Sequence, residues 1–196
     1  MDVGGGGRRP RSIDQGPTPK RVSSSWSPDG SWFVYLSFEN GRESLNKVKT
    51  TGEATPVVLR ADVKRAGPTW GAVWSPAWDW ILYYDTGVKL ISPDGRTTRD
   101  VAPVSALVYA FSADGRTIYG LRQPMPASRV ELFSMSVAGG PEKVIGSLPP
   151  DDLPASATNP GLRLSLTPDG KSFTYSTVRN SSSLWLMDGL KSMTAR

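Results

Sequence analysis

A five-residue turn motif occurs four times in the chain and constrains its fold more than any other feature. The best copy is Trp26-Ser-Pro-Asp-Gly30, and the others occupy 74–78, 111–115 and 166–170. Pro presets φ near about −65°, and Asp-Gly accepts a reversal of the chain, so each copy predicts a tight turn. The second copy is degenerate, because Ala77-Trp78 stands in the place of Asp-Gly. A motif repeated at uneven spacing predicts one structural unit with variable outer loops.

An apolar strand is expected after each of these turns. In each copy we expect two residues of this strand to lie on one face, at equivalent places in the repeat. These residues are Phe33 and Tyr35, Leu82 and Tyr84, Ile118 and Gly120, and Phe173 and Tyr175. Residues two apart lie on the same face of a strand. The intervening Val34 and Tyr83 are apolar as well, so both faces are expected to be covered, as in sheets stacked face to face.

Two more strands and two more turns complete each unit. Asn40-Gly41 is typical of a type I′ hairpin turn. Third strands are predicted at 45–48, 88–91, 132–135 and 184–187, and fourth strands at 55–59, 97–101 and 142–145. Ser92-Pro-Asp-Gly95 resembles the opening turn but stands after a third strand. Four antiparallel strands per repeated unit predict an all-β fold, a β-propeller of about four blades. Four unrelated hairpins in a sandwich are the alternative.

The repeat divides the chain into blades at about 21–61, 69–102, 105–147 and 162–190, with a head at 1–20 and a tail at 191–196. The head contains an expected turn at 4–7 and an expected fourth strand at 8–13, whereas the last copy stops after its third strand. A four-bladed ring closed by its own termini and a portion of a larger ring both fit this pattern. Met1 falls within a strand pattern, which favours the larger ring.

These motifs resemble the TolB-like propeller repeat, which also builds the propeller domains of dipeptidyl-peptidase and prolyl-oligopeptidase relatives. The likeness rests on the turn at 26–30 with Phe33 and Tyr35, the turn at 166–170, and the third strand Leu184-Trp-Leu-Met-Asp-Gly-Leu190. The stretch 179–190 is similar to the ends of propellers attached to bacterial serine/threonine kinases or winged-helix regulators. The resemblance implies a β-propeller fold and allows a periplasmic or extracytoplasmic location.

Composition restricts the chemistry open to the chain. It has no Cys and no His, which excludes thiolate nucleophiles, Ser-His-Asp triads and imidazole ligands from this chain. We predict no catalytic residues, no metal site and no cofactor.

The net charge of +5 is expected to be a scattered surface charge, because the basic run at 8–11 has no stacking aromatics beside it. Nucleic acid is therefore an unlikely partner. No apolar run is long enough for a membrane span, and the head has no signal-peptide pattern.

Several residues are candidates for a phosphate, metal or ligand-binding site. Gly4–Gly7 is interpreted as a turn or linker, because neither a Gly-Lys-Ser/Thr ending nor a helix follows it. Calcium at Asp151-Asp152 would need further carboxylates to converge there. The aspartates of the Asp-Gly turns (Asp29, Asp94, Asp114 and Asp169) are expected to cap their own turns.

The aromatic residues have two expected roles. Trp32, Trp80 and Trp185 are expected to pack between blades. For binding, Trp70, Tyr109 and Arg163 are the candidates, because they stand at or near inner strands, with packing as the alternative role.

The sequence thus favours a non-enzymatic propeller that binds a protein or peptide, as the sensory or scaffolding part of a larger bacterial protein. The alternative is the accessory propeller domain of a serine peptidase whose catalytic domain lies elsewhere.

Overall fold

The structure is a computed structural model that describes residues 20–52, 55–64, 71–102, 106–122, 124, 129–148, 164–167, 169 and 171–175. These residues form three four-stranded antiparallel sheets and one two-stranded sheet. We call the sheets blades 1 to 4 in chain order. No helix that could cross a membrane occurs in the described residues.

Each blade is a meander in which strands pair with their neighbours in sequence. Blade 1 contains β1 (Lys20–Trp26), β2 (Trp32–Glu39), β3 (Arg42–Lys49) and β4 (Val57–Arg60). Blade 2 contains β5 (Val73–Trp74), β6 (Ile81–Tyr84), β7 (Val88–Ile91) and β8 (Thr98–Ala102). Blade 3 contains β9 (Val108–Phe111), β10 (Thr117–Arg122), β11 (Val130–Ser136) and β12 (Lys143–Leu148). Blade 4 is described in β13 (Leu164–Leu166) and β14 (Phe173–Tyr175).

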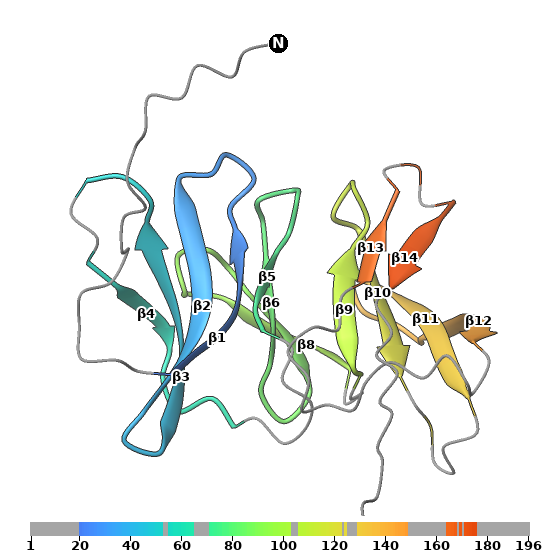
Figure 1. Ribbon diagram of the computed structural model, residues 1–196, viewed down its shortest axis with the longest axis horizontal. Coiled ribbons are helices and arrows are strands. Elements are labelled where there is room, and N and C mark those ends of the chain that lie inside the picture. The colour runs from blue at the N-terminus through green and yellow to red at the C-terminus, as the bar shows by residue number, and fades with distance from the viewer. Residues whose placement is uncertain are drawn as a thin grey trace, which may run out of the picture.

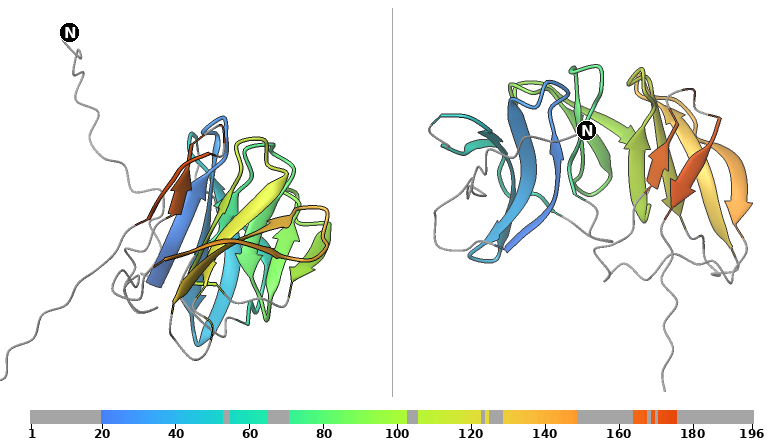
Figure 2. Two further views of the ribbon diagram at one scale, coloured as in Figure 1. Left: turned by 90° about the vertical axis from the view of Figure 1, so that its right-hand side faces the viewer. Right: turned by 45° about the horizontal axis from the view of Figure 1, so that its top comes forward.

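The blades follow one another in chain order, with their first strands next to each other (Figures 1 and 2). β5 contacts both β1 and β9, and β9 also contacts β13. The first strand of every described blade is therefore the innermost one. Repeated four-stranded meanders arranged in this way confirm the predicted all-β propeller architecture.

The register of the strands shows that the blades are copies of one unit. In each complete blade the pairing of the third and fourth strands shifts once, at Leu45/Asn46, Val88/Lys89 and Leu132/Phe133. All three bulges lie at the same distance before the glycine of the following turn, which is Gly52, Gly95 or Gly139. A bulge at one fixed place in each copy is a feature of the repeat, since bulges bend and twist a strand locally.

The apolar cores lie between blades rather than within them. Blades 1 and 2 enclose one core, which includes Val34, Leu36, Leu45, Ile81, Tyr83 and Ile91. Blades 2 and 3 enclose a second, which includes Leu82, Leu90, Ile118, Phe133 and Met135. Blades 3 and 4 enclose a third, which includes Leu121, Leu132 and Leu164. Adjacent residues of one strand, such as Ile81 and Leu82, thus enter different cores. The expectation that both faces of the strands are covered is confirmed for blades 2 and 3.

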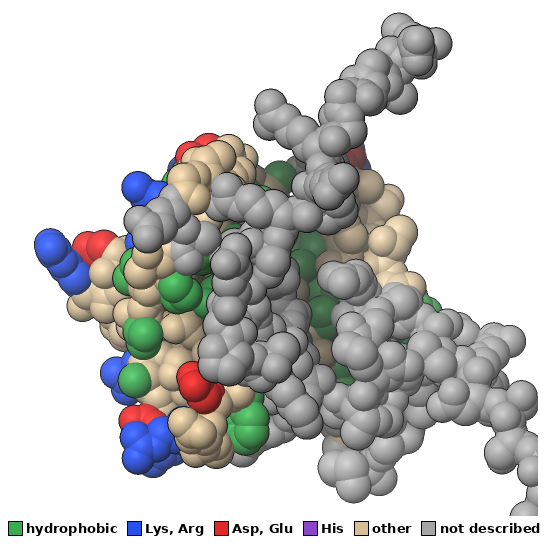
Figure 3. Space-filling view, turned by 60° about the vertical axis from the view of Figure 1, so that its left-hand side comes forward, with side chains coloured by type: hydrophobic (Ala, Val, Ile, Leu, Met, Phe, Trp, Pro, Cys, Tyr) green, Lys and Arg blue, Asp and Glu red, His purple; other side chains and the backbone are tan. Residues whose placement is uncertain are grey.

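The face of blade 1 that points away from blade 2 has the same kind of residues as the inter-blade faces. Trp26, Phe33, Tyr35 and Val48 occupy the repeat positions of Trp74, Ile81, Tyr83 and Ile91, all of which pack in the core between blades 1 and 2. The prediction that Leu82 and Tyr84 are the counterparts of Phe33 and Tyr35 is therefore wrong by one residue, because Trp74 pairs with Ile81 just as Trp26 pairs with Phe33. Tyr35 and Val48 are buried, whereas Trp26 is 54% exposed. Figure 3 shows this side of the molecule, where hydrophobic side chains lie among charged ones. We call this surface the leading face of blade 1.

The strand predictions agree with the structure apart from their ends. The strand at 88–91 is confirmed without change. β4, β8 and β12 begin and end later than predicted, at Val57–Arg60, Thr98–Ala102 and Lys143–Leu148, and the bulge accounts for one residue on each outer strand. Ser92–Gly95 joins β7 to β8, so its predicted place after a third strand is confirmed. The predicted strands at 8–13 and 184–187 lie outside the described residues.

Gly120 tests the packing between blades 2 and 3. A Cβ at this position would lie 2.5 Å from Cζ of Phe133, whose ring fills the space that the glycine leaves open. We expect Gly120→Val to lower the free energy of unfolding by about 1–3 kcal/mol through overpacking, although valine favours strands. Gly146→Val in β12 is the matched control, because a Cβ there meets no atom within 4 Å. Equal denaturation midpoints for the two variants would contradict the packing described.

Candidate functional site

The repeated turn is held by a hydrogen-bond pattern that its sequence explains. Ser112 Oγ donates to Asp114 Oδ1 (2.6 Å) and accepts from the backbone N–H of Thr117 (2.9 Å). Asp114 Oδ1 also accepts from the N–H of Arg116 (3.0 Å). The same side-chain pattern recurs around Asp29, Asp94 and Asp169. The prediction that these aspartates cap their own turns is therefore confirmed.

The degenerate turn of blade 2 forms the same reversal with different residues. Ser75 donates from Oγ to Asp79 Oδ1 at 2.9 Å, so the carboxylate comes from a later position. Trp78 takes the place of the turn glycine and has φ of 69°, close to the 71° of Gly30 and the 70° of Gly115. A non-glycine residue in the left-handed region costs about 1–2 kcal/mol.

All four opening turns lie at one end of the blades, which is the upper rim in Figure 1. We call it the turn-bearing end. Neighbouring turns touch there, because a Cβ on Gly115 would lie 2.7 Å from both Cβ of Ala77 and Oγ of Ser75. Lys47 of blade 1 also donates from Nζ to the carbonyl of Pro93 in blade 2, at 2.6 Å. These contacts connect blades 1, 2 and 3 at the turn-bearing end.

The turn aspartates are stabilised in their charged form. For Asp114 the hydrogen bond from Ser112, followed by that from the N–H of Arg116, lowers the pKa of the carboxyl. The same causes lower the pKa of Asp94 and Asp169, with Thr167 as the hydroxyl donor to Asp169. For Asp29, desolvation acts to raise the pKa, but the hydrogen bonds from Ser27 and Ser31 outweigh it and the net shift is downward.

Tryptophans gather at the turn-bearing end in two different environments. Trp32 and Trp80 hold equivalent repeat positions and each lies under a cation, with Lys47 Nζ 4.3 Å from the Trp32 ring and Arg99 Cζ 4.9 Å from the Trp80 ring. Both also pack against the inter-blade cores, as expected. Trp26 and Trp78 are exposed large hydrophobic residues at this end. They make edge-to-face contacts with Phe33 and Trp74, respectively.

The structure places one of the three predicted binding residues. Tyr109 lies in β9, is buried in the core between blades 2 and 3, and meets Phe133 edge to face at 6.1 Å. Burial first, and then the electrostatic interactions with Tyr84 and Glu142, raises the pKa of its phenol. These contacts are packing contacts, and its role in binding stays a prediction. Trp70 and Arg163 lie outside the described residues, as do Trp185, Gly4–Gly7 and Asp151-Asp152.

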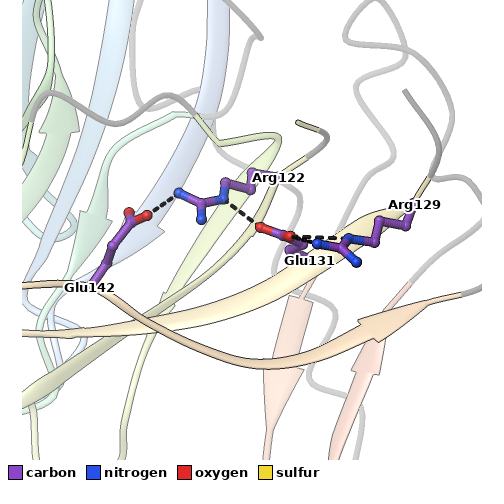
Figure 4. Close-up of polar contacts among 4 residues, drawn as sticks. All are labelled: Arg122, Arg129, Glu131 and Glu142. Atoms are coloured by element: carbon purple, nitrogen blue, oxygen red, sulfur yellow. Dashed lines mark hydrogen bonds and ion pairs between the residues drawn. The ribbon is translucent and has the colours of Figure 1, made fainter. Parts of the chain in front are cut away.

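Sequence reasoning missed a charged network in blade 3 (Figure 4). Arg122 pairs with Glu131 at 3.1 Å and with Glu142, while Arg129 pairs with Glu131 at 2.8 Å. Burial opposes ionisation of Glu131, but the hydrogen bonds from both arginines outweigh it and lower its pKa. The guanidinium of Arg122 also lies 5.1 Å from the Phe133 ring centroid. The direct pairing of Arg122 with Glu131 across β10 and β11 was the available signal, but only with the register known.

In the described part of the chain, no group of three or more His, Cys, Asp or Glu residues is placed to hold a metal ion. The carboxylates described at the turn-bearing end belong to separate turns. The exposed aromatic rings beside them can contact another molecule through apolar and cation–π interactions.

No protein-family model matches the chain, and no curated protein sequence does. Solved structures do match it. TolB from Acinetobacter baumannii matches with a TM-score of 0.64 and 17% identity, over 91% of this chain and 42% of that one. A putative TolB from Agrobacterium tumefaciens matches with a TM-score of 0.57 and 16% identity, over 70% and 52%. A chain in a nidogen–laminin complex matches with a TM-score of 0.58 and 10% identity, over 80% and 56%.

The fold is that of a β-propeller. The likeness to TolB confirms the recognition made from the turn motifs, and at this level of identity it concerns the fold alone. The propeller chain spans about half the length of the solved structures that it matches.

The turn aspartates predict an acid-sensitive propeller. A carboxyl whose pKa is lower in the folded state contributes stability above its unfolded pKa of about 4, and this contribution is lost as pH falls through the folded pKa. We expect the melting temperature to fall below about pH 4. Asp114→Asn should show a smaller fall over the same window, because the lowered pKa of Asp114 no longer contributes. Identical pH profiles for the two proteins would contradict this account.

The network in blade 3 predicts a second difference in stability. Glu131 is largely buried, so Glu131→Gln leaves two arginines without its charge, and we expect a loss of about 2 kcal/mol in the free energy of unfolding. Asp62→Asn is the matched control, because it breaks the exposed pair of Arg42 and Asp62, whose loss costs about 0.5 kcal/mol or less. Urea titration measures both, and equal losses would contradict a structural role for the network.

Proposed function

We propose that this propeller is a non-enzymatic binding module of a larger bacterial protein, where it recognises a protein or peptide and serves in sensing or scaffolding. The observation that carries the proposal is the exposed tryptophan Trp78 at the turn-bearing end, which does not lie on the leading face of blade 1. Tryptophan is enriched in protein interfaces, where its large ring supplies contact area at a low cost in conformational entropy.

The chemistry of the described residues supports binding rather than catalysis. The chain has no His and no Cys, so its acid–base groups are Asp, Glu, Lys and Tyr. The aspartates of the Asp-Gly turns accept hydrogen bonds within their own turns. Glu131 and Glu142 are paired with arginines. These carboxylates are engaged in local structure, whereas Trp78 is exposed.

Two observations support a place in a larger protein. The leading face of blade 1 repeats the apolar residues that pack between blades 1 and 2. The match covers only 52% and 42% of the two TolB chains. A protein partner also fits the likeness to a chain of the nidogen–laminin complex.

A peptide-display screen tests the proposed function. The purified chain is immobilised and panned against a random peptide library, and enriched peptides are then measured in solution by fluorescence anisotropy. We expect saturable binding with a dissociation constant near or below about 10 μM, equivalent to about 7 kcal/mol. The same preparation is assayed with generic ester and peptide substrates. Failure to enrich any peptide, or turnover that a single carboxylate substitution abolishes, would overturn the proposal.

A further inference from the structure

Trp78 occupies a position where the turn itself gives no reason for a tryptophan. The equivalent residues Gly30 and Gly115 adopt the same left-handed backbone without the steric conflict of a Cβ. The hydrogen bonds of the turn come from Ser75 and Asp79 and do not involve the Trp78 side chain. The side chain is 39% exposed. A role for the ring must therefore come from what it contacts.

Within the described residues the ring of Trp78 has one aromatic neighbour and no cation. It meets Trp74 edge to face, with ring centroids 6.1 Å apart and planes at 73°. Cations of the chain lie instead over Trp32 and Trp80, which are equivalent to each other in the repeat. Lysine and arginine are thus the partners that this fold already uses for tryptophans at its turn-bearing end.

The charges beside Trp78 favour a cation from outside the chain. In three Asp-Gly turns a basic residue follows the glycine, namely Arg96, Arg116 or Lys171. In the turn of blade 2, Trp78 stands in the place of the glycine and Asp79 itself follows it, so Asp79 has no basic residue in its own turn. Asp79 is exposed and adjacent to Trp78 in the chain. Arg116, in the neighbouring turn, lies beside Asp114 and helps to lower the pKa of that carboxyl.

We propose that Trp78 and Asp79 together bind a Lys or Arg side chain presented by a peptide segment of a partner protein. The cation lies over the exposed indole face, where the ring quadrupole attracts it, and the carboxylate of Asp79 supplies the complementary charge. This site rests on the proposed function and gives the chemistry of the partner. The net charge of +5 opposes unselective uptake of cationic peptides, so binding depends on this local pair.

The test uses the whole chain labelled with ¹⁵N and a Gly-Ser peptide that carries two arginines. The indole N–H signal of Trp78 is assigned from the spectrum of Trp78→Gly, which supplies the residue found in the equivalent turns. We expect the arginine peptide, titrated to millimolar concentration, to shift the Trp78 signal saturably. A peptide in which citrulline replaces arginine has nearly the same shape without the charge, and it should not shift the signal.

Variants separate binding from folding. Trp78→Gly and Asp79→Asn should keep the melting transition and weaken binding of the arginine peptide roughly 5- to 30-fold, as loss of a cation–π or ion-pair contact implies. Asp62→Asn, an exposed carboxylate elsewhere, should bind like the parent chain. Equal shifts with the citrulline peptide, no shift at all, or full binding by folded Trp78→Gly would overturn the inference.

Two results separate this inference from the proposed function. If peptides enriched by display bind Trp78→Gly as tightly as they bind the parent chain, the proposed site is overturned, whereas the proposed function as a binding module stands. If free arginine amide binds as tightly as the peptide, the proposal of a protein partner is overturned, because the site would then bind a small cation.

Discussion

The structure depends on one constraint, which is that each blade has two apolar faces and cannot cover either of them alone. Ile81 and Leu82 are neighbours in β6, both are fully buried, and they enter two different cores. A sheet of this kind must be stacked between two others, and stacking twisted sheets side by side leads to an arc of blades around a common axis. The leading face of blade 1 follows the same rule, since its apolar residues match those of inter-blade faces position by position.

The repeated turn fits this constraint because it is defined locally. One hydroxyl and one carboxylate satisfy the backbone N–H groups that the reversal leaves without strand partners, so each turn forms without help from the rest of the fold. The contacts of Gly115 with Ala77 and Ser75 then join neighbouring turns. Local preference and global stacking therefore specify the same arrangement, which is the consistency expected of a sequence that folds to one state.

The sequence predicted the propeller, its turns and the shared faces of the strands that follow an Asp-Gly turn, because period-two patterns and Asp-Gly turns are local signals. In the degenerate copy, which has no such glycine to count from, the predicted pair Leu82 and Tyr84 lay one residue late. The sequence predicted β4 and β12 less well, because a bulge appears only when two strands are paired. The network around Arg122 also depends on pairing, since Gly120 makes room for the Phe133 ring over which Arg122 lies. Tyr109 illustrates a geometric point. In a radial sheet the innermost strand turns an edge toward the axis, so its side chains point to the neighbouring blades, and Tyr109 is buried there.

The sequence places Trp78 at the position of the turn glycine but does not predict its left-handed backbone, because a bulky residue in that region contradicts every local preference. The turn tolerates it because Ser75 and Asp79 replace the lost pattern, and because the edge-to-face contact with Trp74, which is worth about 0.5–1.5 kcal/mol, offsets part of the strain. Residues that follow the repeat are explained by folding, so they carry little information about function. A residue that breaks the repeat at a cost, stays exposed and keeps a carboxylate beside it points to selection for something other than stability. For this reason the functional argument rests on the degenerate copy rather than on the best ones.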